Sequence, residues 1–267
     1  MHGTAMRPPV SELERAPTAA GDDARDGPIL PAYLEETYGW AYLRPASVAL
    51  LDHDLVASLV LWGQMERLRR MVARELAPGA RVLQPACVYG GFSRRIAERL
   101  GPAGRLEVRD VAPIQVENCR RKLARFPNCR VACRDAARPT AARYDAVLCF
   151  FLLHELPADW KRRVMAALLG AVRRGGKAIF VDYHRPRPLH PLRWPMRTLF
   201  ARLEPFAEEL WRCELRELAP PATADRFRWS KTTCFGGLYQ MVVARRTASA
   251  DRAEGAAAAL DRPRGGH

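Results

Sequence analysis

Short apolar runs alternate with amphipathic stretches along the middle of the chain, and this pattern predicts strands and helices in turn. The apolar pair Val82–Leu83 predicts a first strand, the apolar spacing over residues 92–100 predicts a helix, and residues 106–110 predict a second strand that ends in Asp110. Gly90–Gly91 closes the turn between the first strand and the helix. These parts form a βαβ unit suited to hold a nucleoside, with the acid at the ribose hydroxyls.

The alternation continues towards the C-terminus. Residues 144–153 are almost uninterruptedly apolar, as expected of a central parallel strand that is buried on both faces. A helix predicted over residues 158–172 stops at Gly175–Gly176, before a strand at 177–183. The pattern therefore predicts an α/β fold, a Rossmann-like, mostly parallel twisted sheet with helices on both faces and an antiparallel last strand. Further strands are predicted at residues 128–136, 227–234 and 238–246.

Composition divides the chain into one domain and two tails. Residues 1–30 and 248–267 are rich in Ala, Gly, Pro, Asp and Arg without apolar periodicity, so both are expected to be disordered. Residues 31–247 are expected to form one domain, with a helical cap over residues 31–76. The apolar stretch at residues 48–62 is too short and too polar to span a bilayer.

Cysteine usage and the N-terminal composition favour a cytoplasmic protein. The seven cysteines contain no CxxC pair, which predicts reduced, buried thiols and neither a disulfide nor a zinc site. The N-terminus carries charge and proline where a signal peptide would be apolar.

The net charge of +14 indicates an anionic partner or a biased composition. Only Lys122, Lys161, Lys177 and Lys231 are lysines, and this arginine skew is typical of a GC-rich genome. Anionic lipid is a second interpretation, since four arginines follow residues 59–62 and predict a basic amphipathic helix with a peripheral contact on the inner membrane. An ordinary helix packed on the sheet is equally consistent. The four arginines are Arg67, Arg69, Arg70 and Arg74.

The glycine turn and the strand ends predict a cofactor site. Residues 86–90 stand where S-adenosylmethionine (SAM) enzymes carry G-x-G-x-G, and Gly90 would let the backbone approach the methionine part of the cofactor. Asp110 is expected to accept the ribose hydroxyls and Asp135 the adenine amine. A helix cap and a turn residue are the structural alternatives for these two acids. The candidate cofactor residues are Gln84, Ala86, Tyr89, Gly90, Asp110, Val111, Asp135, Ala136 and Phe151.

A second group of polar residues follows two strands that are expected to be neighbours. His154 and Glu155 follow the apolar strand, and Asp182, Tyr183 and His184 end the next one. Imidazole and carboxylate groups converging there could bind a cation such as manganese or transfer protons. The predicted catalytic residues are His154, His184 and Tyr183, and the predicted metal ligands are His154, Asp182 and His184. The alternative is that the two histidines only cap a strand end and bind a loop carbonyl.

The order of these elements resembles the class I SAM-dependent methyltransferases, and particular segments narrow the resemblance to the rhodoquinone biosynthesis protein family (RquA). This divergent relative of the quinone methyltransferases is similar to the chain from about Pro31 to Arg246. The segments that carry the resemblance are VLQPACVYG (82–90), DVAPIQVENCRRKL (110–123), CFFLLHELP (149–157), VDYHRP (181–186), HPL (190–192), LEPFA (203–207) and FGGLYQMVVARR (235–246).

The resemblance implies an unusual reaction. Members of this family use SAM and manganese to replace a methoxy group of ubiquinone by an amino group, which gives rhodoquinone without methyl transfer. Gln84 stands where most SAM enzymes carry an acid, and this departure argues against ordinary methyl transfer. Under the resemblance, Tyr183, Trp194, Phe200 and Phe206 are candidates to line a slot for the quinone ring, although aromatic residues also fill cores.

Two other functions remain open from the sequence. One is a conventional SAM-dependent methyltransferase acting on a quinone or another small molecule, which every feature of the fold allows. The other is an RNA-binding or RNA-modifying protein, which the charge alone suggests. Residues 149–152 read CFFL where base-modifying enzymes carry N/D-P-P-Y, so no specific nucleic acid is expected.

Overall fold

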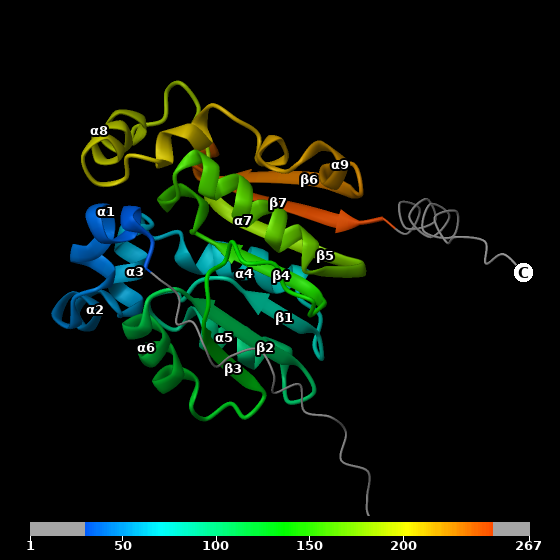
Figure 1. Ribbon diagram of the computed structural model, residues 1–267. Coiled ribbons are helices and arrows are strands. Elements are labelled where there is room, and N and C mark those ends of the chain that lie inside the picture. The colour runs from blue at the N-terminus through cyan, green and yellow to red at the C-terminus, as the bar shows by residue number, and fades with distance from the viewer. Residues whose placement is uncertain (1–29, 248–267) are drawn as a thin grey trace, which may run out of the picture.

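A single mixed sheet organises the computed structural model, which describes residues 30–247 (Figure 1). The strand order is β3-β2-β1-β4-β5-β7-β6, and β7 runs antiparallel to both of its neighbours while β1 to β5 are parallel. This arrangement confirms the predicted fold class. The strands are β1 (Arg81–Gln84), β2 (Arg105–Asp110), β3 (Cys129–Cys133), β4 (Tyr144–Phe150), β5 (Val172–Tyr183), β6 (Phe227–Cys234) and β7 (Tyr239–Arg246).

Helices cover both faces of the sheet because β4 and β5 bury apolar side chains on both sides. On one face, Leu148 and Ile179 belong to a core shared with α4 (Met65–Glu75) and α5 (Phe92–Leu100). On the other face, Cys149 and Phe180 pack in a core shared with α7 (Ala158–Gly170). The remaining helices of the described chain are α1 (Ala32–Tyr42), α2 (Pro45–Leu51), α3 (Asp54–Val60), α6 (Pro113–Leu123), α8 (Arg193–Leu203) and α9 (Pro221–Ala224).

The end of β4 and the start of β5 differ from the predicted strands. The apolar run ends as a strand at Phe150, because Phe151 takes a left-handed conformation with φ of 50° and the chain then forms a 3-10 turn at Leu153–Glu155. β5 already begins at Val172, so Gly175 and Gly176 lie inside a strand where the sequence predicted a helix stop. At Gly176 the strand passes so close to Asp145 O that a Cβ would lie 2.9 Å from it.

Only part of the predicted cap at residues 31–76 lies apart from the sheet. Met65, Leu68 and Val72 of α4 are buried in the core, so α4 belongs to a helix layer, whereas α1 to α3 lie beyond the strand ends (Figure 1). No helix in residues 30–247 combines the length and apolar character needed to cross a membrane. The tails predicted to be disordered lie outside the described residues, except for Leu30.

Candidate functional site

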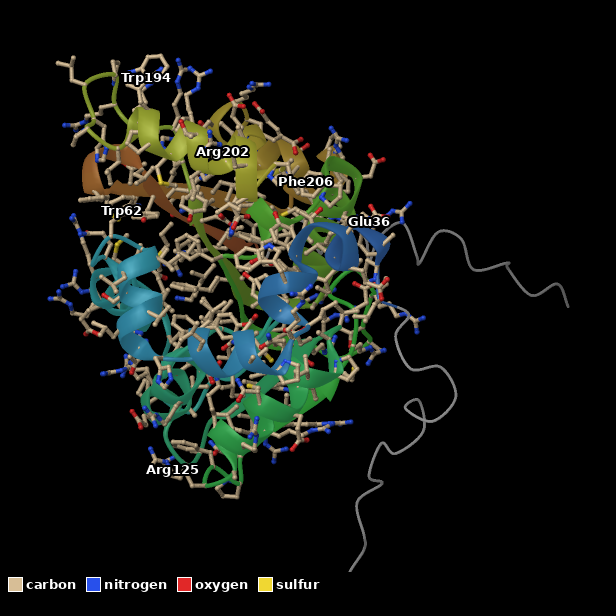
Figure 2. The ribbon with its side chains drawn as sticks, turned by 90° about the vertical axis from the view of Figure 1, so that its left-hand side faces the viewer. Glu36, Trp62, Arg125, Trp194, Arg202 and Phe206 are labelled. Carbon is tan, nitrogen blue, oxygen red and sulfur yellow. The ribbon has the colours of Figure 1, made fainter. Side chains whose placement is uncertain are left out.

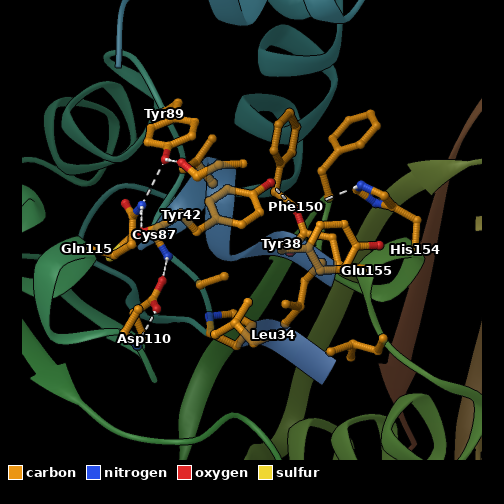
Figure 3. A pocket seen from close by; sticks show the side chains of 18 of the residues that line it. Leu34, Tyr38, Tyr42, Cys87, Tyr89, Asp110, Gln115, Phe150, His154 and Glu155 are labelled. Carbon is orange, nitrogen blue, oxygen red and sulfur yellow. Dashed lines mark hydrogen bonds and ion pairs between the residues drawn. The ribbon is translucent and has the colours of Figure 1, made fainter. Parts of the chain in front are cut away.

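A cavity of about 270 Å³ opens at the carboxyl ends of β1, β2 and β4, under the helices α1 to α3. Ligands bind at this edge of open α/β sheets, where the strand order reverses between β1 and β4. Figure 3 shows Asp110 and Cys87 at one end of the cavity and His154 and Glu155 at the other. The cavity therefore contains residues from both groups that the sequence predicted at this edge of the sheet.

Asp110 lies at the end of the cavity where the sequence predicts the cofactor. Its carboxylate accepts backbone N–H groups of Cys87 and Ala112, each at 2.9 Å. Burial raises the pKa of Asp110 above its usual value, although these hydrogen bonds oppose the change. The first bond ties β2 to the turn after β1 and holds the turn at the cavity wall. Six other predicted cofactor residues also line the cavity: Ala86, Tyr89, Val111, Asp135, Ala136 and Phe151.

Asp135 and Tyr89 also have structural contacts, and the contact of Asp135 is the alternative that the sequence left open. Asp135 accepts the amide of Ala137 at 2.8 Å, as a turn residue does, while it lines the cavity. Tyr89 lines the cavity as well, but its hydroxyl donates to Ala41 O and accepts from Gln115, so it also fastens α1 to the sheet.

Gly90 does not line the cavity, which corrects its predicted role. The amides of Gly90 and Gly91 donate to Asp52 Oδ1 and Asp54 Oδ1, at 2.7 and 2.8 Å. Lys122 then bridges Asp52 to the turn through Val88 O and Gly90 O. The glycine turn is thus a docking point for the helices α2 and α3 that cover the cavity, and an amide-rich turn suits carboxylates.

Gln84 is also away from the cavity. Its Nε2 donates to Ala86 O at 2.6 Å and to Ser93 Oγ at 2.9 Å, and its side chain is buried. Its Oε1 has no hydrogen-bond partner. Gln84 therefore holds the turn after β1 through these hydrogen bonds, and it does not line the cavity.

Replacing Gly90 by alanine is expected to loosen this cap. A Cβ there would lie 2.6 Å from Asp54 Oδ1 and 3.2 Å from Asp54 Cα, at a φ of 70°. The left-handed conformation costs about 1–2 kcal/mol for a residue with a Cβ, and the overlap adds about 1–3 kcal/mol. Gly79→Ala is the control, because Gly79 has a φ of 77° and open space around it. In denaturant unfolding, Gly90→Ala should lower the free energy of unfolding more than Gly79→Ala does. An equal decrease in both variants would contradict the docking role of Gly90.

The second end of the cavity is built around His154, which is buried. Its Nδ1 lies 2.9 Å from Asp182 Oδ1, and Asp182 Oδ2 also accepts the amides of Leu153 and His154. β4 and β5 are parallel neighbours, which explains why these two residues meet as predicted. The contact orients the imidazole so that Nε2 points to Glu155 Oε1 and Glu204 Oε2, each 3.9 Å away.

The surroundings of this cluster raise the pKa values of His154, Glu155 and Glu204. Burial disfavours the charged imidazolium, but Asp182 and then the two glutamates outweigh it and raise the pKa of His154 to about 9. Burial also raises the pKa of Glu155 to about 8 against the opposing charge of His154. Burial likewise raises the pKa of Glu204. At neutral pH the cavity therefore contains a cationic imidazole beside a carboxyl group that can donate a proton.

The predicted metal triad of His154, Asp182 and His184 is not assembled, which corrects that prediction. Asp182 directs its oxygens to His154 and to backbone amides, and His184 Nδ1 lies 2.8 Å from Gly237 O. Within residues 30–247 no three His, Cys, Asp or Glu side chains are arranged to hold a metal ion. These three residues therefore do not form the predicted manganese site. His184 also does not line the cavity.

Tyr183 lines the cavity as predicted, although it is buried among aromatic rings. Its ring meets those of His154 and Phe151 edge-on, with centroid distances of 4.9 and 5.4 Å. Burial raises the pKa of its hydroxyl well above the usual value, so it stays protonated. Phe200 packs on Tyr183 in the core, and Trp194 is exposed, so neither lines the cavity as a ring slot. Phe206 is also outside the lining.

Two tyrosines of α1 complete the cluster, and sequence reasoning missed them. Tyr38 donates to Glu204 Oε2 at 2.9 Å, and Tyr42 donates to Glu155 Oε1. Both line the cavity. Their spacing of four residues places both hydroxyls on one helix face, which is the signal that could have revealed them. Glu155 was predicted only as an alternative to Asp182 in supplying oxygen to a cation, and Glu204 was not predicted as a site residue.

Comparison with known proteins agrees with this geometry. Residues 82–176 match a family described as a methyltransferase domain. The N-methyltransferase NodS from Bradyrhizobium japonicum WM9, solved with S-adenosyl-L-homocysteine, is 16% identical, with 78% of this chain and 95% of that chain covered and a TM-score of 0.52. An O-methyltransferase family protein from Burkholderia thailandensis is 14% identical, with 78% and 69% covered and a TM-score of 0.55. No curated protein sequence matches the chain significantly.

These similarities establish the fold of the protein. The strand order and the solved structures identify the Rossmann-like fold of SAM methyltransferases. The domain match supports a SAM-dependent, methyltransferase-like enzyme.

Proposed function

We propose that the chain is a SAM-using transferase that replaces a methoxy group of ubiquinone by an amino group, as in rhodoquinone biosynthesis. The observation that carries the proposal is one cavity with Asp110, the predicted partner of a ribose, at one end and the cluster of His154, Glu155 and Glu204 at the other. The choice of ubiquinone rests on the sequence resemblance. The cavity supports it, because aromatic and apolar side chains make up most of the wall between the two ends.

The cofactor end fits SAM. Asp110 accepts two backbone amides and still faces the cavity, where it can receive ribose hydroxyls. Ala136 and Phe151 provide a small and a flat apolar surface for an adenine ring. Bound SAM would supply its amine nitrogen in the proposed reaction, or an electrophilic methyl group in a conventional methyltransferase.

The opposite end can move the protons that the exchange requires. The amine of SAM adds to the electrophilic ring carbon, a C–N bond forms, the C–O bond to methoxy breaks, and one proton passes from nitrogen to the leaving oxygen. Release of a free amino group then requires that the bond between this nitrogen and the α-carbon of SAM also break. The quinone ring can take up two electrons and two protons while the N–Cα bond becomes an imine, and water hydrolyses the imine to the amino-quinol and the 2-oxo acid derived from SAM. Glu155 carries a proton at neutral pH and can give it to methoxide, which leaves as methanol, and can then take the proton from nitrogen. The cationic His154 can stabilise negative charge on a ring oxygen. The proposal assigns no step to manganese, because its predicted ligands bind protein partners.

Isotope transfer tests the proposal. The purified chain is incubated with short-tailed ubiquinone and SAM labelled with nitrogen-15 at the amine or deuterium at the methyl group, with and without manganese, and the quinone is analysed by mass. Nitrogen label in the product, without methyl label, is the expected result. Methyl label without nitrogen would identify a conventional methyltransferase, the alternative that the domain match favours. Asp145→Asn, at the far end of β4, is the matched active control.

A further inference from the structure

The exposed apolar side chains of the described residues are gathered on one side of the molecule. They belong to two segments, residues 40–62 and 189–203, which form α1, α2, α3, α8 and adjoining turns. These helices lie together on the left in Figure 1 and face the viewer in Figure 2, where Trp62 and Trp194 are labelled. The large exposed apolar residues are Trp40, Leu50, Leu55, Leu59, Val60, Trp62, Leu189, Trp194 and Leu203. We call this surface the apolar face.

Several apolar side chains in and just after α3 point into solvent. Leu55 and Leu59 are four residues apart on α3, which places them on one face of the helix, and Trp62 follows two residues after the helix ends. Trp62 takes a φ of 52°, a left-handed conformation that is uncommon for a bulky residue. The residue is 44% exposed. The backbone is therefore strained at a position where the indole is exposed to solvent, and strained residues of this kind cluster at functional sites.

The same face is basic. Residues 185–203 contain five arginines and no acid, and Arg197 lies over the ring of Trp194 at 5.2 Å. Exposed Arg67, Arg70 and Arg74 of α4 line a groove against the end of β6. Arg69 differs from the sequence prediction, because it is buried and pairs with Asp54.

The acids near this face are mostly engaged or distant. Asp52 binds Lys122, and Asp54 binds Arg69 and the glycine turn. Glu66 lies 4.0 Å from Arg69, and Glu36 appears at the opposite edge of the face from Trp62 and Trp194 in Figure 2. Positive charge therefore dominates around the two tryptophans.

We propose that the apolar face docks on an anionic lipid bilayer. Apolar helices lying in the membrane interface combine Trp and Leu with arginines that attract acidic headgroups, and the indole ring favours that interface. The cavity reaches the same surface, since Trp40 and Val60 both line it and are 48% and 58% exposed. Docking would turn this entrance towards the lipid. The arginines favour lipid over a second copy of the chain, because two such faces would repel each other. The inference is independent of the reaction proposed above.

Vesicle sedimentation of the full chain tests this docking. Vesicles of phosphatidylcholine with phosphatidylserine are expected to bind the chain at least tenfold more tightly than phosphatidylcholine alone. The double variant Leu55→Ser/Leu59→Ser and the single variant Arg197→Glu should each weaken binding severalfold. Arg125→Glu is the control, because Arg125 lies away from α8 and α3 at the lower edge of Figure 2 and its side chain is exposed. Circular dichroism checks that every variant folds.

Three outcomes would overturn the docking proposal. One is absence of binding to the anionic vesicles. Another is an equal decrease in vesicle affinity in Arg125→Glu and Arg197→Glu, which would show that the overall charge of the protein, and not this face, attracts lipid. The third is a dimer in analytical ultracentrifugation that Leu55→Ser/Leu59→Ser disperses while vesicle binding is unchanged, which would make the face an interface between two copies.

Discussion

Replacing Asp110 by alanine is expected to weaken SAM binding roughly 30- to 1000-fold, which corresponds to about 2–4 kcal/mol. The carboxylate is proposed to accept two ribose hydroxyls, and hydrogen bonds to a charged acceptor are about twice as strong as neutral ones. The substitution also removes the acceptor for the amides of Cys87 and Ala112, so the turn beside the cavity loses its tie to β2. Isothermal titration calorimetry with SAM measures the effect.

Two further variants separate binding from folding. Asp110→Asn retains one oxygen acceptor for the backbone and should bind SAM with intermediate affinity. Asp145→Asn replaces an acid at the opposite end of the sheet, where it binds Arg81 N and Arg173, and should bind SAM like the parent. Unchanged affinity in Asp110→Ala would remove Asp110 from the cofactor site.

The second large effect is expected from Glu155→Gln, which should lower turnover roughly 10²- to 10⁴-fold, the range of general acid–base catalysis. The amide retains an oxygen for the hydroxyl of Tyr42 but has no proton to donate to a leaving group. The pKa of Glu155 is about 8, so turnover of the parent should fall as the pH rises through that value. The residual rate of the variant should lack this fall. Initial rates between about pH 6 and pH 10 provide the measurement.

Glu98→Gln is the control for this substitution, because Glu98 is half exposed and pairs with Arg125 far from the cavity. It should keep the parental rate and pH profile. Full turnover in Glu155→Gln, or the same pH profile in both variants, would assign the proton transfer to another group.

The same two groups give folding stability a definite dependence on pH. Glu155 binds its proton more tightly in the folded chain, with a pKa of about 8 against the ordinary 4.5, so its contribution to stability falls as pH rises from 4.5 to 8. His154 has a folded pKa of about 9 against 6.5, so its contribution is fully present below 6.5 and is lost as pH rises through 9. The melting temperature should therefore drop between pH 5 and pH 9 (roughly this window), and less so in Glu155→Gln.

The sequence by itself determined the fold and several of the residues that line the cavity. Apolar periodicity is a local property, so the runs at Val82–Leu83 and in β4 predicted buried strands before any contact was known. Parallel strands end at one edge of the sheet, which is why Asp110, Asp135 and His154 were predicted to line one site. The pairing of His154 with Asp182 followed from the same rule, because β4 and β5 are neighbours.

Only the tertiary structure decided what covers that edge. Tyr38 meets Glu204 across 166 residues and Tyr42 meets Glu155 across 113, and no local pattern encodes such contacts. Gly90 matched a cofactor turn, yet its amide binds Asp52 of the cap because α2 and α3 fold back over the turn. His184 follows β5 directly, but its ring contacts the carbonyl oxygen of Gly237 in the turn before β7. The ring is therefore turned away from the cavity. Periodicity fixes which residues are buried, whereas the packing of distant segments fixes which buried groups meet.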